Sequence, residues 1–173
     1  MNILIANTQE FNPQIGGVER VSSILATEFI KLGHQVFFIA CSRSLFPGKY
    51  TTSAPQTILA DTTIYNSEEN IGEFCNFLEK HKIDIVMNQA GNIKEFSSLC
   101  FSAAEIYKKA KILSVIHIDP INRFKYLLDL TPSILPGKKN YKNIARLIVL
   151  PYRLIKIYLS ESSLYNFVYR NSE

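Results

Sequence analysis

Long apolar runs are missing from this sequence. None of its hydrophobic stretches approaches the roughly 18 residues that a membrane-spanning helix requires. The amino terminus also has no basic segment, and its first apolar run is too short for a secretory signal peptide. We therefore expect neither kind of segment, and we expect a cytoplasmic protein.

Cysteine and histidine are scarce, with three residues of each type. They are Cys41, Cys75, Cys100, His34, His81 and His117. The cysteines are odd in number, widely spaced and surrounded by apolar residues, which predicts reduced thiols that pack as small core side chains. No histidine stands at a metal-ligand spacing from a cysteine, so we expect no metal site.

Glycine and proline are also sparse, at seven each, and they are scattered along the chain. The sequence therefore contains no evident linker, low-complexity segment or internal repeat. The 173 residues are 47% hydrophobic and 20% charged, a composition typical of a globular protein that is long enough to bury a core. These features predict one domain.

The net charge of +4 is unevenly distributed. Residues 1–110 contain 9 basic and 11 acidic side chains, a balance of −2, whereas residues 111–173 contain 10 and 4, a balance of +6. This asymmetry favours either an anionic partner for the C-terminal third or a face that meets another part of a larger protein.

Apolar, β-branched runs alternate with stretches of helical periodicity along the first two thirds of the chain. The strands expected are 2–7, 34–41, 83–87 and 111–118, with short extended pieces at 56–60 and 62–65. The helices expected are 18–32, capped by Gly33, a second that follows a Ser67 N-cap, and 96–107. Because the strands are continuously apolar, this alternation predicts an α/β fold, a Rossmann-like doubly wound parallel sheet with helices on both faces.

Several motifs of nucleotide-binding and hydrolytic enzymes are absent. The sequence has no G-x-G-x-x-G fingerprint, no P-loop and no G-x-S-x-G elbow. The second expected strand ends without the carboxylate that holds a ribose in dinucleotide-binding proteins, although Arg43 could meet a 2′-phosphate. A dehydrogenase is therefore the weakest of the functional hypotheses.

Four polar segments follow expected strands, at the ends where ligands of open α/β sheets bind. They are the Gly16-Gly17 loop, Cys41–Arg43, Asn88–Gly91 and His117–Pro120. Two glycines before a helix allow close approach of an anion to the free N–H groups of the first turn. The ordinary alternative for His117 is a histidine at the edge of the core that is hydrogen-bonded to the backbone. Glu19 is most simply a first-turn acid that complements the helix dipole.

After Asp119 the pattern changes. A long connection at 121–137 is followed by helical stretches at about 139–159 and 161–170, and residues 138–159 interleave basic and aliphatic side chains. Two interpretations stay open for this region. It is either a peripheral contact with the inner face of the membrane, or a core-facing helix with a solvated basic side or a surface covered by another domain. No strand follows the last helix, so we expect the chain to be a fragment.

Residues 15–21, Ile-Gly-Gly-Val-Glu-Arg-Val, follow the first strand and resemble the N-terminal motif of family-4 glycosyltransferases. These are retaining enzymes of the GT-B fold that use nucleotide-activated sugars. His117, at the end of a Ser-Val-Ile-His run, resembles the histidine that many members carry there. Residues 163–173 resemble the helix that precedes the next strand of the family. The resemblance implies that 1–173 is a single Rossmann-like N-terminal, acceptor-side domain, and that the C-terminal nucleotide-sugar domain is absent from this chain.

The resemblance also implies roles for individual residues. Gly16 and Gly17 would donate backbone N–H groups to the donor's diphosphate, and His117 would act as a catalytic residue that hydrogen-bonds the transferred sugar. The candidates for contacts with the acceptor or the cleft are Asn88, Gln89, Asp119 and Arg43. No metal, no resident cofactor and no nucleic-acid partner is expected. The partners would be a nucleotide sugar, a glycan or lipid-linked acceptor and the missing domain.

The family resemblance thus implies a hexosyltransferase of polysaccharide or glycolipid assembly. Because the chain would supply only half of the site, the fragment alone is expected to be inactive. A second hypothesis stays open, namely a non-catalytic Rossmann-like module that binds a nucleotide or a phosphorylated metabolite.

Overall fold

The computed structural model describes residues 1–43, 51–60 and 63–117. Its strands are β1 (Asn2–Gln9), β2 (Gln35–Ser42), β3 (Gln56–Ile58), β4 (Ile85–Asn88) and β5 (Lys111–Ser114). Its helices are α1 (Gly17–Lys31), α2 (Glu68–Lys80) and α3 (Lys94–Tyr107). The strands form one sheet in the order β3-β2-β1-β4-β5, and every pair is parallel.

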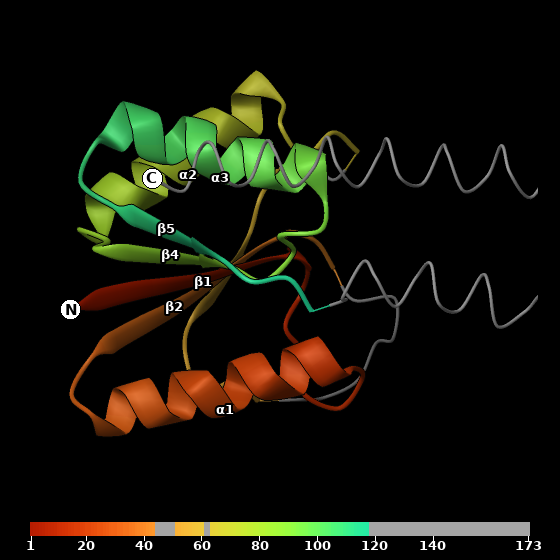
Figure 1. Ribbon diagram of the computed structural model, residues 1–173, viewed down its shortest axis with the longest axis vertical. Helices are drawn as coiled ribbons and strands as arrows, with labels where there is room; N and C mark the ends of the chain where they lie inside the picture. Colours follow the sequence, from red (N-terminus) through yellow and green to blue (C-terminus); the bar gives the residue numbers. More distant parts are fainter. Residues whose placement is uncertain (44–50, 61–62, 118–173) are drawn as a thin grey trace, which may run out of the picture. The chain divides into compact units, whose positions relative to one another are not determined.

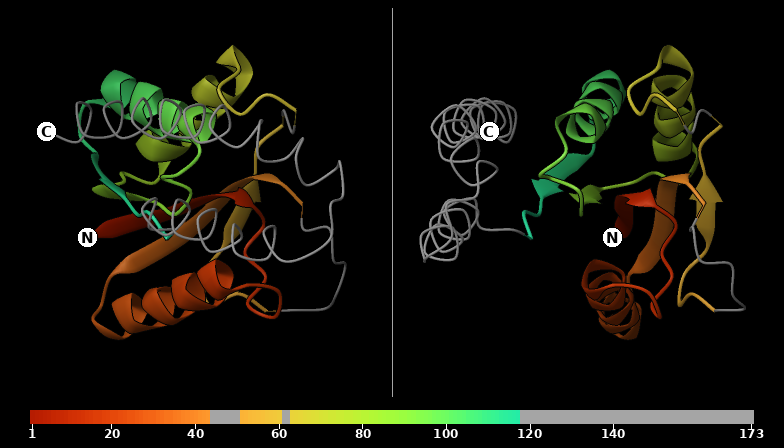
Figure 2. Two further views of the ribbon diagram at one scale, coloured as in Figure 1. Left: turned by 45° about the vertical axis from the view of Figure 1, so that its right-hand side comes forward. Right: turned by 90° about the vertical axis from the view of Figure 1, so that its right-hand side faces the viewer.

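The helices cover both faces of the sheet (Figures 1 and 2). Helix α1 lies on one face and packs with the side chains of Ile3 and Ile5, whereas α2 and α3 lie on the other face with Leu4 and Ala6. Successive side chains of a strand point to opposite faces, so β1, with all five residues from Ile3 to Asn7 buried, contributes to both layers. The predicted fold class follows directly from this two-sided burial.

The local signals for the ends of helices are confirmed. The hydroxyl of Ser67 accepts a hydrogen bond from the backbone N–H of Asn70 at 3.3 Å, which caps α2. Gly33 has a φ of +83°, a left-handed conformation that glycine adopts without steric penalty after a helix. Both signals identify boundaries to within one or two residues of the observed ones.

Two strand boundaries differ from the prediction for tertiary reasons. Strand β1 continues to Gln9, and the N–H of Glu10 still bonds the carbonyl of Ser42 at 2.8 Å. The loop before α1 is therefore shorter than expected, and it is anchored by Phe11, whose buried ring stacks on Phe38 at 4.4 Å. Strand β5 ends at Ser114, because its partner β4 ends at Asn88 in register with it.

The structure corrects one expected extended piece and the start of one strand, and it does not describe the C-terminal region. Residues 63–65, within the expected extended piece at 62–65, form no strand. Strand β4 begins at Ile85, two residues later than expected. The predictions for Asp119, 121–137, 139–159 and 161–170 lie outside the described residues.

The strand order defines where a ligand of this fold would bind. The chain passes from β1 to β2 and β3 on one side, then crosses to β4 on the other side of β1. The seam between β1 and β4 is thus a topological switch point, and in open α/β sheets the crevice lies outside the carboxyl ends of the strands there.

Candidate functional site

The candidate site lies at the carboxyl end of the seam between β1 and β4. Ala6 pairs with Asn88, and the N–H of Gln89 bonds the carbonyl of Ala6 at 2.9 Å, so Asn7 and Gln89 are neighbours one position further along. Ile5 and Met87 point to the face covered by α1, and side chains two positions further along a strand point to the same face. Asn7 and Gln89 therefore belong to that face. Their side chains are buried, which is uncommon for amides and calls for hydrogen-bond partners.

Gln89 makes the contact that connects two of the predicted site residues. Its Oε1 atom lies 2.7 Å from Nε2 of the exposed His117. Its Nε2 atom is buried and has no hydrogen-bond partner among the described residues. Rotating the amide by 180° would leave Oε1 as the unpartnered atom instead, and would turn the amide N–H groups toward His117. A buried polar atom without a partner destabilises a fold by about 1–3 kcal/mol, so this amide is not optimised for stability.

The turn at 88–91 also fixes the backbone that carries His117. The N–H of Val115 bonds the carbonyl of Asn88 at 2.8 Å, and the N–H of Gly91 bonds the carbonyl of Val115 at 3.2 Å. A Cβ added at Gly91 would lie 2.7 Å from the Val115 oxygen, closer than a real Cβ approaches such an atom. Gly91 belongs to the polar segment expected at this edge of the sheet, but the sequence assigned it no role of its own. A glycine beside two amides after a strand was the available signal.

Asn88 occupies the other side of the sheet. Its Nδ2 donates to the hydroxyl of Ser97 in α3 at 2.9 Å, and its Oδ1 accepts from the N–H of Ala90 at 3.0 Å. The side chain is fully buried. Both ends of this amide therefore have partners inside the protein, and these bonds fasten the turn to α3.

The glycine loop is arranged differently from a simple anion cradle. Gly16 is the N-cap of α1 with a φ of −138°, an extended conformation, and no side chain caps the helix. A Cβ added at Gly16 would overlap the carboxylate of Glu19, and Nδ2 of Asn7 lies 3.5 Å from that carboxylate. A negative side chain therefore lies at the positive end of the helix dipole. A Cβ at the exposed Gly17 would meet nothing.

The remaining candidates lie apart from this group. Arg43 is exposed and follows β2, which β1 separates from β4. Asp119 lies outside the described residues. The structure therefore brings together Gln89 and His117 at one point, and Gly16, Glu19 and Asn7 at another, with Asn7 and Gln89 adjacent across the seam.

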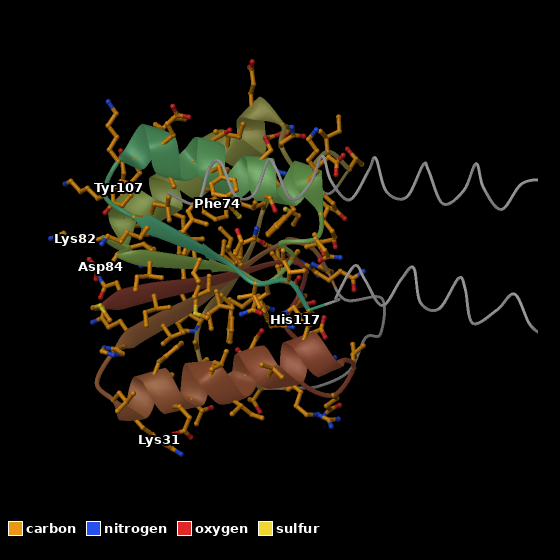
Figure 3. All side chains as sticks on the ribbon, viewed as in Figure 1. Lys31, Phe74, Lys82, Asp84, Tyr107 and His117 are labelled. Carbon is orange, nitrogen blue, oxygen red and sulfur yellow. The ribbon has the colours of Figure 1, made fainter. Side chains whose placement is uncertain are left out.

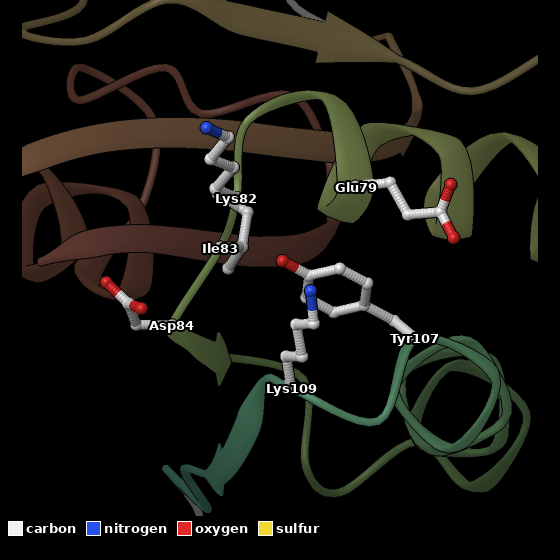
Figure 4. A pocket seen from close by; sticks show the side chains of 6 residues that line it. All are labelled: Glu79, Lys82, Ile83, Asp84, Tyr107 and Lys109. Carbon is white, nitrogen blue, oxygen red and sulfur yellow. The ribbon is translucent and has the colours of Figure 1, made fainter.

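A separate hollow of about 510 Å³ opens at the opposite end of the sheet (Figure 4). It is lined by Glu79, Lys82, Ile83, Asp84, Tyr107 and Lys109. These residues come from the ends of α2 and α3 and from the connections that lead to the amino ends of β4 and β5. Figure 3 shows His117 at the other end of the sheet from Lys82, Asp84 and Tyr107. The hollow thus lies at the amino ends of the strands, whereas ligands of open α/β sheets bind at the carboxyl ends.

The described residues contain no group of three or more histidine, cysteine or acidic side chains that could hold a metal ion. No helix among them is long and apolar enough to cross a membrane.

No family model matches the sequence, and no curated protein matches it. Among solved structures, the chain is similar to the apo form of the lipopolysaccharide outer core galactosyltransferase WaaB, with a TM-score of 0.53 and 16% sequence identity. The likeness covers 70% of this chain and 35% of that one, so the chain spans about a third of that structure. The likeness and the sheet topology together confirm the fold class expected from the sequence: a Rossmann-like doubly wound α/β sheet, of the kind that forms one half of a GT-B fold.

Proposed function

We propose that this chain is the N-terminal, acceptor-side domain of a retaining glycosyltransferase of the family-4 type. The complete protein would transfer a hexose from a nucleotide sugar to a glycan or a lipid-linked acceptor in polysaccharide or glycolipid assembly. The observation that carries the proposal is the Gln89–His117 contact at the switch point of the sheet, beside the glycine loop of α1. The fold likeness to a galactosyltransferase supports the general class.

The chemistry requires groups of the kind found at this seam. Cleavage of a sugar–diphosphate bond develops negative charge on the leaving group, and fixed N–H dipoles aimed at that charge lower the barrier. The first turn of α1 has no side-chain cap, so Gly17 and the residues after it keep backbone N–H groups for such a contact. His117 would bind a hydroxyl of the transferred sugar. Under this proposal neither a metal ion nor a resident cofactor takes part.

The proposal assigns the other half of the site to a second domain that binds the nucleotide sugar. It places the protein in the cytoplasm, with residues 138–159 as a peripheral membrane contact. The 173 residues alone should show no turnover, because the leaving group would lack half of its binding site. Asp119 and Arg43 stay predicted contacts of the cleft.

A transfer assay on the complete protein that contains this chain tests the proposal. Release of nucleoside diphosphate would be measured with a panel of uridine and guanosine diphosphate hexoses, with glycan and lipid-linked acceptors, and the product anomer would be assigned by NMR. His117→Ala should lower kcat/KM about 100-fold, the scale of losing one preorganised hydrogen-bonding group at a reacting centre. His34→Ala, at the amino end of β2, is the matched control and should leave kcat/KM unchanged.

Two outcomes would count against the proposal. Unchanged kcat/KM in His117→Ala would remove the histidine from the site. Nucleotide binding by the complete protein without transfer to any acceptor would favour the non-catalytic Rossmann-like module instead.

A further inference from the structure

We propose that Gln89 is a positioning residue that holds the His117 imidazole through Nε2, so that Nδ1 is the ring nitrogen left to face a ligand. The ligand group that suits an unprotonated Nδ1 is a hydroxyl, which can donate a hydrogen bond to it. The inference rests on the proposed function only for the identity of the molecule that carries this hydroxyl.

The first support is the way in which the turn holds the histidine segment. Asn88 and Gly91 bond the backbone of Val115, and Gln89, between them in sequence, contacts the ring of His117. Both the backbone and the side chain of this segment are thus held by three residues of the stretch 88–91, which begins with the last residue of β4. The turn is itself fastened to α3 through the Asn88–Ser97 hydrogen bond.

The second support is the direction of the Gln89–His117 contact. In the orientation that the structure gives Gln89, its Oε1 atom lies 2.7 Å from Nε2 of His117, and because an amide oxygen only accepts, Nε2 of His117 carries the shared proton in this arrangement. In the neutral ring Nδ1 is then an acceptor. A phosphate or carboxylate oxygen has no proton to offer this atom, whereas a sugar hydroxyl has one. The Gln89 orientation therefore selects the class of ligand group.

The third support is that Gln89 is poorly explained as a stabilising residue. It is almost completely buried, yet Nε2 of its amide has no partner among the described residues. Leucine has a similar volume and would leave no polar atom unpaired at this position. Replacing Gln89 by leucine should therefore leave the thermal stability of the protein unchanged or raise it, while removing the contact that orients His117.

The experiment follows the imidazole N–H of His117 by ¹H–¹⁵N NMR in the full 173-residue chain. His117→Ala assigns the signal, and His34 and His81 are internal references. The wild type should show His117 protonated at Nε2, with that proton protected from exchange with water. Gln89→Leu and Gln89→Met should each speed the exchange about tenfold, the scale of one lost hydrogen bond. Gln89→Glu keeps an acceptor oxygen and should preserve the protection. Gln35→Leu, at the amino end of β2, is the matched control.

Each outcome decides the question. A His117 ring protonated at Nδ1 in the wild type would overturn the assignment of the ligand-facing atom. Equal exchange rates in the wild type, Gln89→Leu and Gln89→Met would overturn the positioning role, and so would loss of folding in both variants, which would show that Gln89 serves stability. The readout needs no substrate, so failure of the transfer assay above would leave this result intact.

Discussion

Replacing Asn88 with alanine tests whether this amide is a part of the fold or a contact for a ligand. The structure gives it two internal bonds, from Nδ2 to Ser97 and from the Ala90 N–H to Oδ1, at 2.9 and 3.0 Å. Each bond contributes about 1 kcal/mol net, and a buried partner left unpaired costs about 1–3 kcal/mol. The Ser97 hydroxyl keeps only a long contact of 3.5 Å to the carbonyl of Gly91. We therefore expect Asn88→Ala to lower the free energy of unfolding by about 2–4 kcal/mol.

Urea denaturation followed by circular dichroism measures this effect, and thermal unfolding should show a fall in Tm of roughly 6–12 °C. Asn76→Ala, on the exposed side of α2, is the matched control and should change stability little. Ser97→Ala leaves the Asn88 amide unpaired, so the double variant should lose less than the sum of the two single losses. A loss of less than about 0.5 kcal/mol in Asn88→Ala, the range of a surface substitution, would refute the argument and favour the predicted ligand contact of Asn88.

Three further results are expected. Gly91→Ala should lower the free energy of unfolding, measured in urea, by about 1–3 kcal/mol, because the added Cβ would press on the Val115 carbonyl. Gly72→Ala, in α2, is the control and should raise it by about 0.5–1 kcal/mol, because its Cβ would meet no other atom. Equal effects of the two substitutions would contradict the close approach at Gly91. His81 packs on Phe37 and Phe77, and burial, followed by the charge of Lys80, lowers its pKa. The unfolded chain therefore binds the proton more readily than the folded one, and Tm should fall as the pH drops below about 6.5. In His81→Phe this part of the pH dependence should vanish. The three cysteines are buried, and burial raises the pKa of Cys100 and Cys75. A thiol reagent at pH 8 should therefore react slowly with the native protein, whereas in urea it should react with all three thiols. Rapid labelling of the native protein would contradict this packing.

The parts of the fold that could be predicted from the sequence are those encoded by neighbouring residues. The run from Ile3 to Ala6 is apolar at every position, and such a run is buried on both faces wherever it becomes a strand. Gly33 and Ser67 act through their own backbone or the next helical turn. These signals need no knowledge of tertiary structure, and together they suffice for a doubly wound sheet.

The parts that could not be predicted depend on partners far away in the sequence. Phe11 lies in a polar loop, and only the approach of Phe38 makes it a core residue. The end of β5 is set by the end of β4, and the bond between Gln89 and His117 spans 28 residues. Hydrophobic periodicity carries no information about such pairs. The sequence could therefore indicate that polar segments meet at one edge of the sheet, but not which amide is buried and which contacts the histidine.

At the glycine loop, the position of the Glu19 side chain changes which ligand the two glycines would suit. Two glycines before a helix suggest an anion site, yet the carboxylate of Glu19 already lies beside Gly16, with the Asn7 amide near it. A phosphate could approach Gly16 only if this carboxylate moved away, because two negative charges repel each other, so the proposed contact with a diphosphate requires Glu19 to turn away from Gly16. A neutral hydroxyl would meet no such barrier, since a carboxylate accepts the hydrogen bond that a hydroxyl donates. Asn7 contacts Glu19, Gln89 contacts His117, and Asn7 and Gln89 are neighbours across the seam. The Glu19 carboxylate and Nδ1 of His117 are thus two hydrogen-bond acceptors at the same end of the sheet. Both would favour a ligand rich in hydroxyl groups.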